Sequence, residues 1–174
     1  MLRLQGTVVM LVVWLLAIVP AQAISFTTLE GTELRLAELR GQPVLVVNTA
    51  SLCGFTRQYA DMQALHERFG PRGLVVLAVP SDDFNQELGS DTEVAEFCEV
   101  NFGLTFPITR IVPVLGPQAH PFYRWLAVAH GKRPGWNFNK ALIGPDGDLR
   151  GFWGASVRPV SRPVVRAVEQ ALRC

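Results

Sequence analysis

The sequence predicts a single α/β domain, built on a central mixed β-sheet with helices on both faces. Two apolar, β-branched runs, Val44–Val47 and Leu74–Val79, have the length and composition of buried strands. A segment with helical spacing of apolar residues separates them, and a strand–turn–strand pattern comes near the C-terminus. Parallel strands joined by helices, followed by a hairpin and a last helix, give a mixed sheet that is covered on both faces.

The first half of the chain is predicted to contain an opening hairpin and a helix between the two buried strands. The hairpin pairs Phe26–Leu29 with Glu33–Leu36 around the turn Glu30-Gly31-Thr32. The helix spans about Phe55–Phe69, because its apolar residues recur at helical spacing and Gly70-Pro71 ends the pattern.

The second half of the chain is predicted to contain three helices and a hairpin. Ser90 and Glu93 match a capping box, so a helix is expected to begin there and to run to Phe102, with Gly103 ending it. The other expected elements are a helix over Pro121–Ala129, strands over Ala141–Ile143 and Leu149–Trp153 joined by Pro145–Asp148, and a last helix from about Ser161.

Charge and composition exclude several classes of protein. The 174 residues include 16 Lys and Arg and 15 Asp and Glu, which gives a formal net charge of +1. A nucleic-acid-binding protein usually shows a clear basic excess, so no nucleic-acid partner is expected. High apolar content with a net charge near zero argues against disorder. Three cysteines are too few for a small disulfide-stapled scaffold.

An apolar N-terminal run precedes the domain. Val8–Val19 carries no charge, lies behind Arg3, and leads to Pro20 and then to Ala21-Gln22-Ala23. A positive start, a short apolar core and an A-x-A ending are typical of a secretory signal peptide. We therefore interpret residues 1–23 as a signal peptide and residues 24–174 as a periplasmic or secreted domain without stable membrane association. The alternative is an uncleaved membrane anchor.

Cys53 is the residue that most directly indicates chemistry. It lies in the loop Asn48–Gly54, at the carboxyl end of the first buried strand and before the first helix, where ligands of such sheets bind. A thiol at a helix N-terminus faces unpaired N–H groups and the positive end of the dipole, which favour the reactive thiolate. The alternative interpretation is that Cys53 is a small buried apolar residue.

Thr56 occupies the position where a C-x-x-C motif would place its second cysteine. A local dithiol that exchanges disulfides therefore cannot form. A lone thiolate suits attack on a small electrophile such as a peroxide, which yields a sulfenic acid that a second thiol can convert to a disulfide.

Three segments in the same order resemble the glutathione peroxidase family. They are Asn48–Thr56 (NTASLCGFT), Val79–Glu87 (VPSDDFNQE) and Trp136–Lys140 (WNFNK), and the similarity runs from about Phe26 to Leu172. The resemblance implies a thioredoxin-like fold and the reduction of hydrogen peroxide and organic hydroperoxides.

The resemblance also assigns roles to individual residues. The family's attacking selenocysteine or cysteine matches Cys53, and its Trp and Asn match Trp136 and Asn137. An indole N–H and an amide can donate hydrogen bonds to a thiolate and to a peroxide oxygen that gains charge. The fourth position, usually Gln, falls on Asp83, and the segment is one residue shorter than the family pattern after Phe84.

Asp83 is open to two interpretations. It is either a site residue or a solvated loop acid next to Asp82. An ionised Asp83 beside Cys53 would disfavour the thiolate, whereas a protonated or outward-facing carboxyl would not. The shortened segment can also bring Gln86 nearer to the site than the alignment suggests.

The other two cysteines differ in their expected roles. Thioredoxin-dependent members resolve the oxidised first cysteine with a second one on the helix that begins near Ser90, so Cys98 is the candidate resolving residue. The alternative for Cys98 is a core-facing residue without a redox task. Cys174, the last residue, is a spare thiol, a partner in an intermolecular disulfide or an alternative resolver, and we assign it no catalytic role.

The resemblance extends to assembly and reductant. The stretch from Pro113 to Trp136 lacks the longer insertion of tetrameric, glutathione-using members, which implies a monomer reduced by a thioredoxin-like protein rather than by glutathione. We expect an external thiol reductant and no bound cofactor, and the three histidines show no metal-ligand spacing. The functional alternatives are a thiol–disulfide oxidoreductase and a peroxide-responsive redox sensor.

Overall fold

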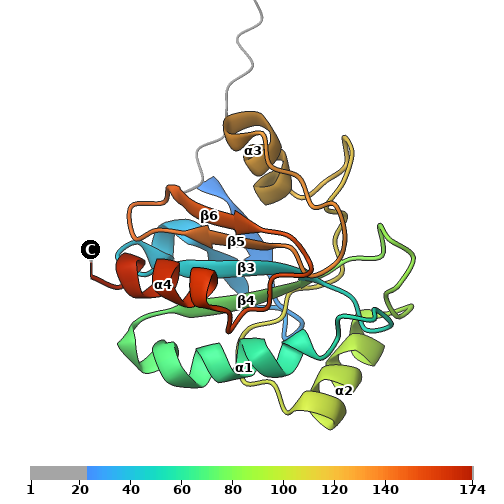
Figure 1. The fold of residues 1–174 in the computed structure, drawn as a ribbon. Coiled ribbons are helices and arrows are strands. Elements are labelled where there is room, and N and C mark those ends of the chain that lie inside the picture. The colour runs from blue at the N-terminus through green and yellow to red at the C-terminus, as the bar shows by residue number, and fades with distance from the viewer. Residues whose placement is uncertain (1–22, 174) are drawn as a thin grey trace, which may run out of the picture.

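Four strands form the central sheet, in the order β4-β3-β5-β6. The computed structural model describes residues 23–173, and the sheet lies between layers of helices (Figure 1). β3 (Val44–Thr49) and β4 (Val75–Pro80) are parallel, whereas β5 (Lys140–Ile143) is antiparallel to β3 and β6 (Leu149–Trp153) is antiparallel to β5. The mixed sheet predicted from the sequence is confirmed.

Alternate residues of β3 face two separate apolar cores. Leu45 and Val47 pack into one core, and Val44 and Val46 pack into the other. All six residues of β3 are buried, because the strand has a neighbour on each edge and helices on each face. β-Branched side chains suit such a strand, which explains the continuous apolar run in the sequence.

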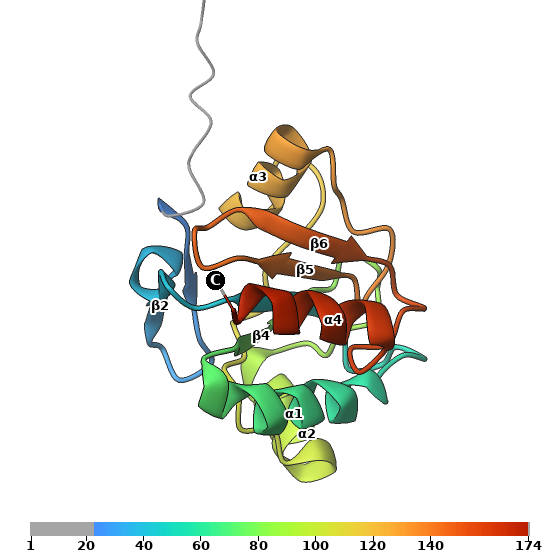
Figure 2. The ribbon, with the colours of Figure 1, turned by 60° about the vertical axis from the view of Figure 1, so that its left-hand side comes forward.

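Three helices cover one face of the sheet. They are α1 (Gln58–Phe69), α2 (Asp91–Phe102) and α4 (Arg162–Ala171), and their buried apolar residues belong to the core around Leu45 and Val47. Figure 2 shows α4 and α1 running next to each other on this face. An exposed ion pair between Arg68 of α1 and Glu169 of α4 joins them.

The opposite face carries the remaining helix and the opening hairpin. α3 (Pro121–His130) packs there with β1 (Ser25–Thr27) and β2 (Glu33–Arg35), which form the expected two-stranded antiparallel hairpin. Two short 3₁₀ helices, η2 (Leu36–Leu39) and η3 (Gly70–Arg72), follow β2 and α1.

The helix start expected at Ser90 is confirmed, with Ser90 as the N-cap. The Ser90 hydroxyl oxygen accepts a hydrogen bond from the backbone N–H of Glu93 at 3.3 Å, and the hydroxyl donates to the Glu93 carboxylate at 2.8 Å. Gly103 ends α2 in the left-handed conformation, with φ of 55°. α2, which carries Cys98, therefore has a defined end at each terminus.

The expected signal peptide, residues 1–23, lies outside the described residues except for Ala23. Within residues 23–173, no helix is both long enough and apolar enough to cross a membrane.

Candidate functional site

Cys53 lies four residues beyond the end of β3, in a series of turns that leads to α1. Its side chain is 4% exposed, and its sulfur accepts a hydrogen bond from the backbone N–H of Phe55 at 3.5 Å. The backbone N–H of Thr56 donates to the Cys53 carbonyl at 3.1 Å, and α1 begins only at Gln58. The prediction that Cys53 directly precedes the helix is corrected, because turn N–H groups rather than the helix N-terminus lie next to the thiol.

A second segment, residues 86–88, holds the chain on the N-terminal side of Cys53. The backbone N–H of Leu52 donates to the Gln86 carbonyl at 2.8 Å. The backbone N–H of Ser51 and that of Leu88 both donate to Oε1 of Glu87, each at 2.9 Å. A buried carboxylate with two backbone donors anchors the loop that presents Cys53.

A third segment, residues 136–139, is held at the same end of the sheet by Asn48, near the end of β3. The Asn48 amide donates to the Trp136 carbonyl at 3.0 Å and accepts from the backbone N–H of Asn139 at 3.0 Å. Sequence reasoning assigned Asn48 no role. The available signal was a polar side chain in a buried apolar strand, which requires hydrogen-bond partners.

Trp136 and Asn137 differ in burial. The Trp136 side chain is 40% exposed, and its ring lies beside that of Phe84, with 5.2 Å between centroids. Asn137 is fully buried, and its amide nitrogen donates to Oε1 of Gln86 at 3.1 Å. The structure therefore brings the Cys53 loop, Gln86 and Asn137 together through direct contacts.

Asp83 is directed elsewhere. It is exposed, and its Oδ2 accepts hydrogen bonds from the backbone N–H groups of Val114 at 2.5 Å and Leu115 at 2.8 Å. These bonds tie the loop after β4 to the loop before α3. Of the two residues considered for the position near Cys53, Gln86 makes the contacts to the site and Asp83 does not.

Cys98 is buried on α2, in the same apolar core as Cys53, and both thiols are free. Burial raises the pKa of the Cys98 thiol to about 11; the Tyr59 hydroxyl opposes this shift and the Glu87 carboxylate adds to it. Burial also raises the pKa of Glu87, against the hydrogen bonds from Ser51 and Leu88. Cys98 is therefore a protonated thiol at neutral pH.

Two exposed apolar side chains lie close to Cys53 in the sequence. Leu52, which directly precedes Cys53 in the chain, is 62% exposed, and Phe55, which follows two residues after it, is 37% exposed. We call Leu52, Phe55, Phe84 and Trp136 the apolar rim. Exposed apolar groups close to a nearly buried thiol suit an apolar ligand or partner.

Lys140, the last residue of the third motif, is fully buried at the start of β5. Its ammonium nitrogen lies 3.3 Å from the Ala155 carbonyl oxygen and 3.5 Å from that of Gly154. Burial lowers the pKa of Lys140 to about 7, although the Asp61 carboxylate acts in the opposite direction. Asp61 itself binds Arg158 through both carboxylate oxygens, at 2.8 and 2.5 Å.

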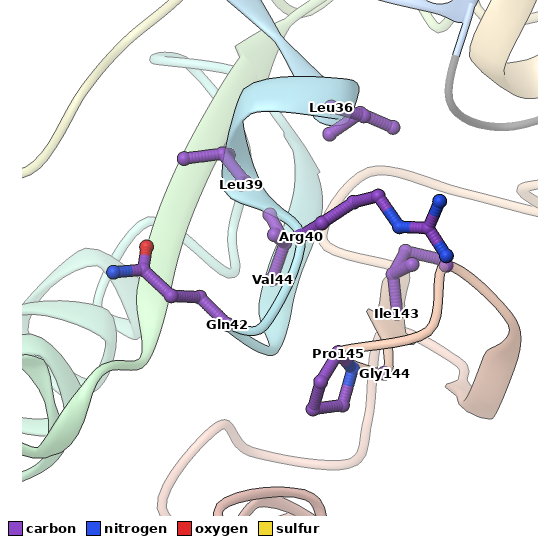
Figure 3. A pocket seen from close by; sticks show the side chains of 9 residues that line it. Leu36, Leu39, Arg40, Gln42, Val44, Ile143, Gly144 and Pro145 are labelled. Carbon is purple, nitrogen blue, oxygen red and sulfur yellow. The ribbon is translucent and has the colours of Figure 1, made fainter.

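A small cavity lies far from Cys53, at the opposite end of β3 (Figure 3). Leu36, Val44 and Pro145 are among its lining residues, and its volume of about 10 Å³ is too small for a substrate. In the part of the chain that the structure describes, no three His, Cys, Asp or Glu residues are grouped to hold a metal ion.

Comparison with known proteins gives consistent matches. The family model for glutathione peroxidase matches residues 22–127. The chain is 40% identical over 149 residues to a hydroperoxy fatty acid reductase, gpx1, of Synechocystis, which covers 78% of this chain and 86% of the relative. It is also 40% identical over 130 residues to a glutathione peroxidase of Lactococcus lactis, covering 72% of this chain and 83% of the relative.

Solved structures confirm the thioredoxin-like fold. The crystal structure of Trgpx in its apo form superposes with a TM-score of 0.71 and 29% identity, covering 90% of this chain and 97% of the other. A thioredoxin-family thiol:disulfide interchange protein from Chlorobium tepidum superposes with a TM-score of 0.65 over 88% of this chain and 95% of its own. At 22% identity, this second likeness concerns the fold alone.

Proposed function

We propose that this chain, which belongs to the glutathione peroxidase family, is a thiol-dependent peroxidase that reduces hydrogen peroxide and organic hydroperoxides. The observation that carries the proposal is the position of Cys53. This thiol lies beyond the carboxyl end of β3, in a loop that residues 86 and 87 hold, and Gln86 in turn contacts Asn137.

In the first step, the Cys53 thiolate attacks one peroxide oxygen. A sulfur–oxygen bond forms, the oxygen–oxygen bond breaks, and the departing oxygen takes a proton to leave as water or an alcohol. Cys53 becomes a sulfenic acid. The indole N–H of Trp136 and an amide N–H of Asn137 stabilise the oxygen that gains charge. Asp83 takes no part, because its carboxylate binds the backbone of Val114 and Leu115.

In the second step, Cys98 attacks the sulfenic acid of Cys53. A disulfide forms, and the hydroxyl of the sulfenic acid leaves as water with the proton of the Cys98 thiol. Cys98 is 1% exposed on α2 and its raised pKa keeps the thiol protonated, so we propose that local opening of α2 accompanies this step.

The substrate and reductant proposals rest on the surface near Cys53. The apolar rim is suited to the hydrocarbon part of an organic hydroperoxide and to the apolar surface of a protein reductant. A thioredoxin-like protein then reduces the disulfide in place of glutathione, and the chain needs no prosthetic cofactor. The short connection between Pro113 and Trp136 supports a monomer.

The proposed site of action is the periplasm or the exterior of the cell, and it is supported by the sequence pattern of residues 1–23. Cell fractionation with a tag at the C-terminus tests this: a soluble extracytoplasmic product of reduced mass agrees with cleavage. A full-length product in the membrane fraction would instead indicate the anchor.

Of the functional alternatives, the thiol–disulfide oxidoreductase is disfavoured by Thr56, which replaces the second thiol of a C-x-x-C motif. Insulin reduction without peroxide would support it. A redox sensor would differ from a peroxidase in having slow oxidation of Cys53 in a stopped-flow experiment.

The proposed function is tested by peroxide consumption with dithiothreitol as the reductant. The wild-type chain is expected to consume hydrogen peroxide and an organic hydroperoxide. Cys53→Ser should abolish the activity, because no thiolate remains at the site. Cys98→Ser should still consume peroxide, because dithiothreitol can attack the sulfenic acid of Cys53 directly. Comparable activity of the Cys53→Ser variant and the wild type would overturn the proposal.

A further inference from the structure

Gln86 lies between β4 and α2, directly after a turn that returns the chain to the Cys53 loop. Asn85, the preceding residue, has φ of 54°, and its backbone N–H donates to the Asp82 carbonyl at 2.8 Å. Asn is one of the few non-glycine residues that adopt this left-handed conformation readily. The turn is therefore stable, and it places Gln86 beside the loop of the reactive thiol.

Two groups of Gln86 bind two different parts of the site. Its carbonyl oxygen accepts from the backbone N–H of Leu52 at 2.8 Å, one residue before Cys53. Its side-chain oxygen accepts from the amide nitrogen of Asn137 at 3.1 Å. Gln86 therefore contacts both the loop that carries Cys53 and the side-chain amide of Asn137.

The Asn137 side chain depends on this contact. It is fully buried, and among the described residues its Oδ1 has no hydrogen-bond partner. An amide group carries two N–H donors, of which one is directed to Gln86. Because the hydrogen bond to Gln86 holds the buried amide, its removal frees the amide to rotate about its terminal bond.

We propose that Gln86 is a positioning residue for the peroxidase reaction. Gln86 holds one N–H of Asn137, so that the other N–H is directed to the oxygen that gains charge as the peroxide bond breaks. Asp83 does not take this place, because its Oδ2 is bound to the backbone N–H groups of Val114 and Leu115. This inference rests on the proposed function.

The test is a double-mutant cycle on the rate of Cys53 oxidation. Gln86→Met removes the acceptor and keeps the length of the side chain, and Asn137→Ala removes the amide. The matched control is Gln118→Leu, at an exposed position of the loop before α3. Stopped-flow tryptophan fluorescence of the full chain gives the second-order rate constant with hydrogen peroxide.

We expect Gln86→Met to lower this rate constant roughly tenfold or more in the wild-type background, since oriented donors of this kind contribute at least that much. In the Asn137→Ala background the same change should lower it less than about threefold, because Gln86 then has no amide to orient. Equal losses in the two backgrounds, or an unaltered rate in Gln86→Met, would overturn the inference.

A spectroscopic measurement separates positioning from a general structural effect. In ¹⁵N NMR of the reduced chain, the side-chain amide of Asn137 should exchange its protons faster in Gln86→Met than in wild type. The free energy of unfolding should stay within about 1 kcal/mol of the wild-type value. Unaltered exchange would contradict the inference even with a slower enzyme, and a wild-type chain that does not react with peroxide would overturn the proposed function instead.

Discussion

Lys140, the charged residue of the motif Trp136–Lys140, is fully buried. The substitution Lys140→Met tests whether its amine is neutral in the folded protein. Among residues 23–173, the Lys140 amine has the Ala155 and Gly154 carbonyl oxygens as its hydrogen-bond acceptors, at 3.3 and 3.5 Å. Burial lowers the pKa of Lys140 from 10.5 to about 7. The folded protein therefore binds fewer protons than the unfolded chain between these two pH values, and its stability rises with pH there.

The magnitude follows from this proton difference. Between pH 7.5 and 9.5 the unfolded lysine is almost fully protonated and the folded one is largely neutral, which gives a slope of about 1.4 kcal/mol per pH unit. Over this interval, the free energy of unfolding of the wild type should rise by about 2.5 kcal/mol relative to Lys140→Met. The Cys98 thiol, whose pKa burial raises to about 11 in the fold, also adds a pH dependence, but it is common to both proteins and cancels in the difference.

The assay is urea unfolding followed by tryptophan fluorescence, at pH 7.5, 8.5 and 9.5 under reducing conditions. Lys132→Met is the matched control, because Lys132 is exposed and no slope difference is expected for it. Parallel stability curves for the wild type and Lys140→Met would refute the reasoning, since they would mean that the amine stays charged in the folded protein.

Three further predictions concern Ser90, Glu87 and Arg158. Ser90→Ala removes the N-cap of α2 and should lower the stability of this helix by about 1 kcal/mol. If local opening of α2 exposes Cys98, alkylation of its thiol should become about fivefold faster. An unaltered alkylation rate would contradict the link between the cap and Cys98. The raised pKa of Glu87 means that the wild type loses stability as this carboxyl ionises. Glu87→Gln should therefore gain stability relative to the wild type as pH rises from 4.5 towards neutrality. Curves of unfolding free energy against pH that stay parallel for the two proteins would argue against this. Arg158→Met should lower the free energy of unfolding by clearly more than Arg166→Met, because the nearly buried carboxylate of Asp61 loses both of its hydrogen bonds to Arg158. A loss as small as that of Arg166→Met, a change at an exposed position of α4, would show that the pair contributes nothing.

Strong local patterns predicted the fold well. The β-branched run of β3 and the capping box at Ser90 each have one dominant structural solution, and the structure confirms both. The start of α1 was predicted too early, at about Phe55. The helix begins at Gln58 without a side-chain cap, so its start has no capping signal in the sequence.

The candidate site was predicted less completely, because side-chain directions depend on contacts distant in sequence. Asp83 and Gln86 lie three residues apart, and the turn at Asn85 decides which of them approaches the Cys53 loop. Asn48 holds residues 136–139 through partners about 90 positions away, as their sequence separations of 88 and 91 show. The burial of Lys140 was not predicted either, since lysine is rarely buried.

The proposed reaction begins with oxidation of Cys53 by the peroxide. The most direct measurement is peptide mass spectrometry of the reduced Cys98→Ser chain after one equivalent of hydrogen peroxide and a sulfenic-acid-trapping reagent. A single trapped oxidation product is expected, on Cys53. Trapping on Cys174 with Cys53 left as a thiol would contradict it.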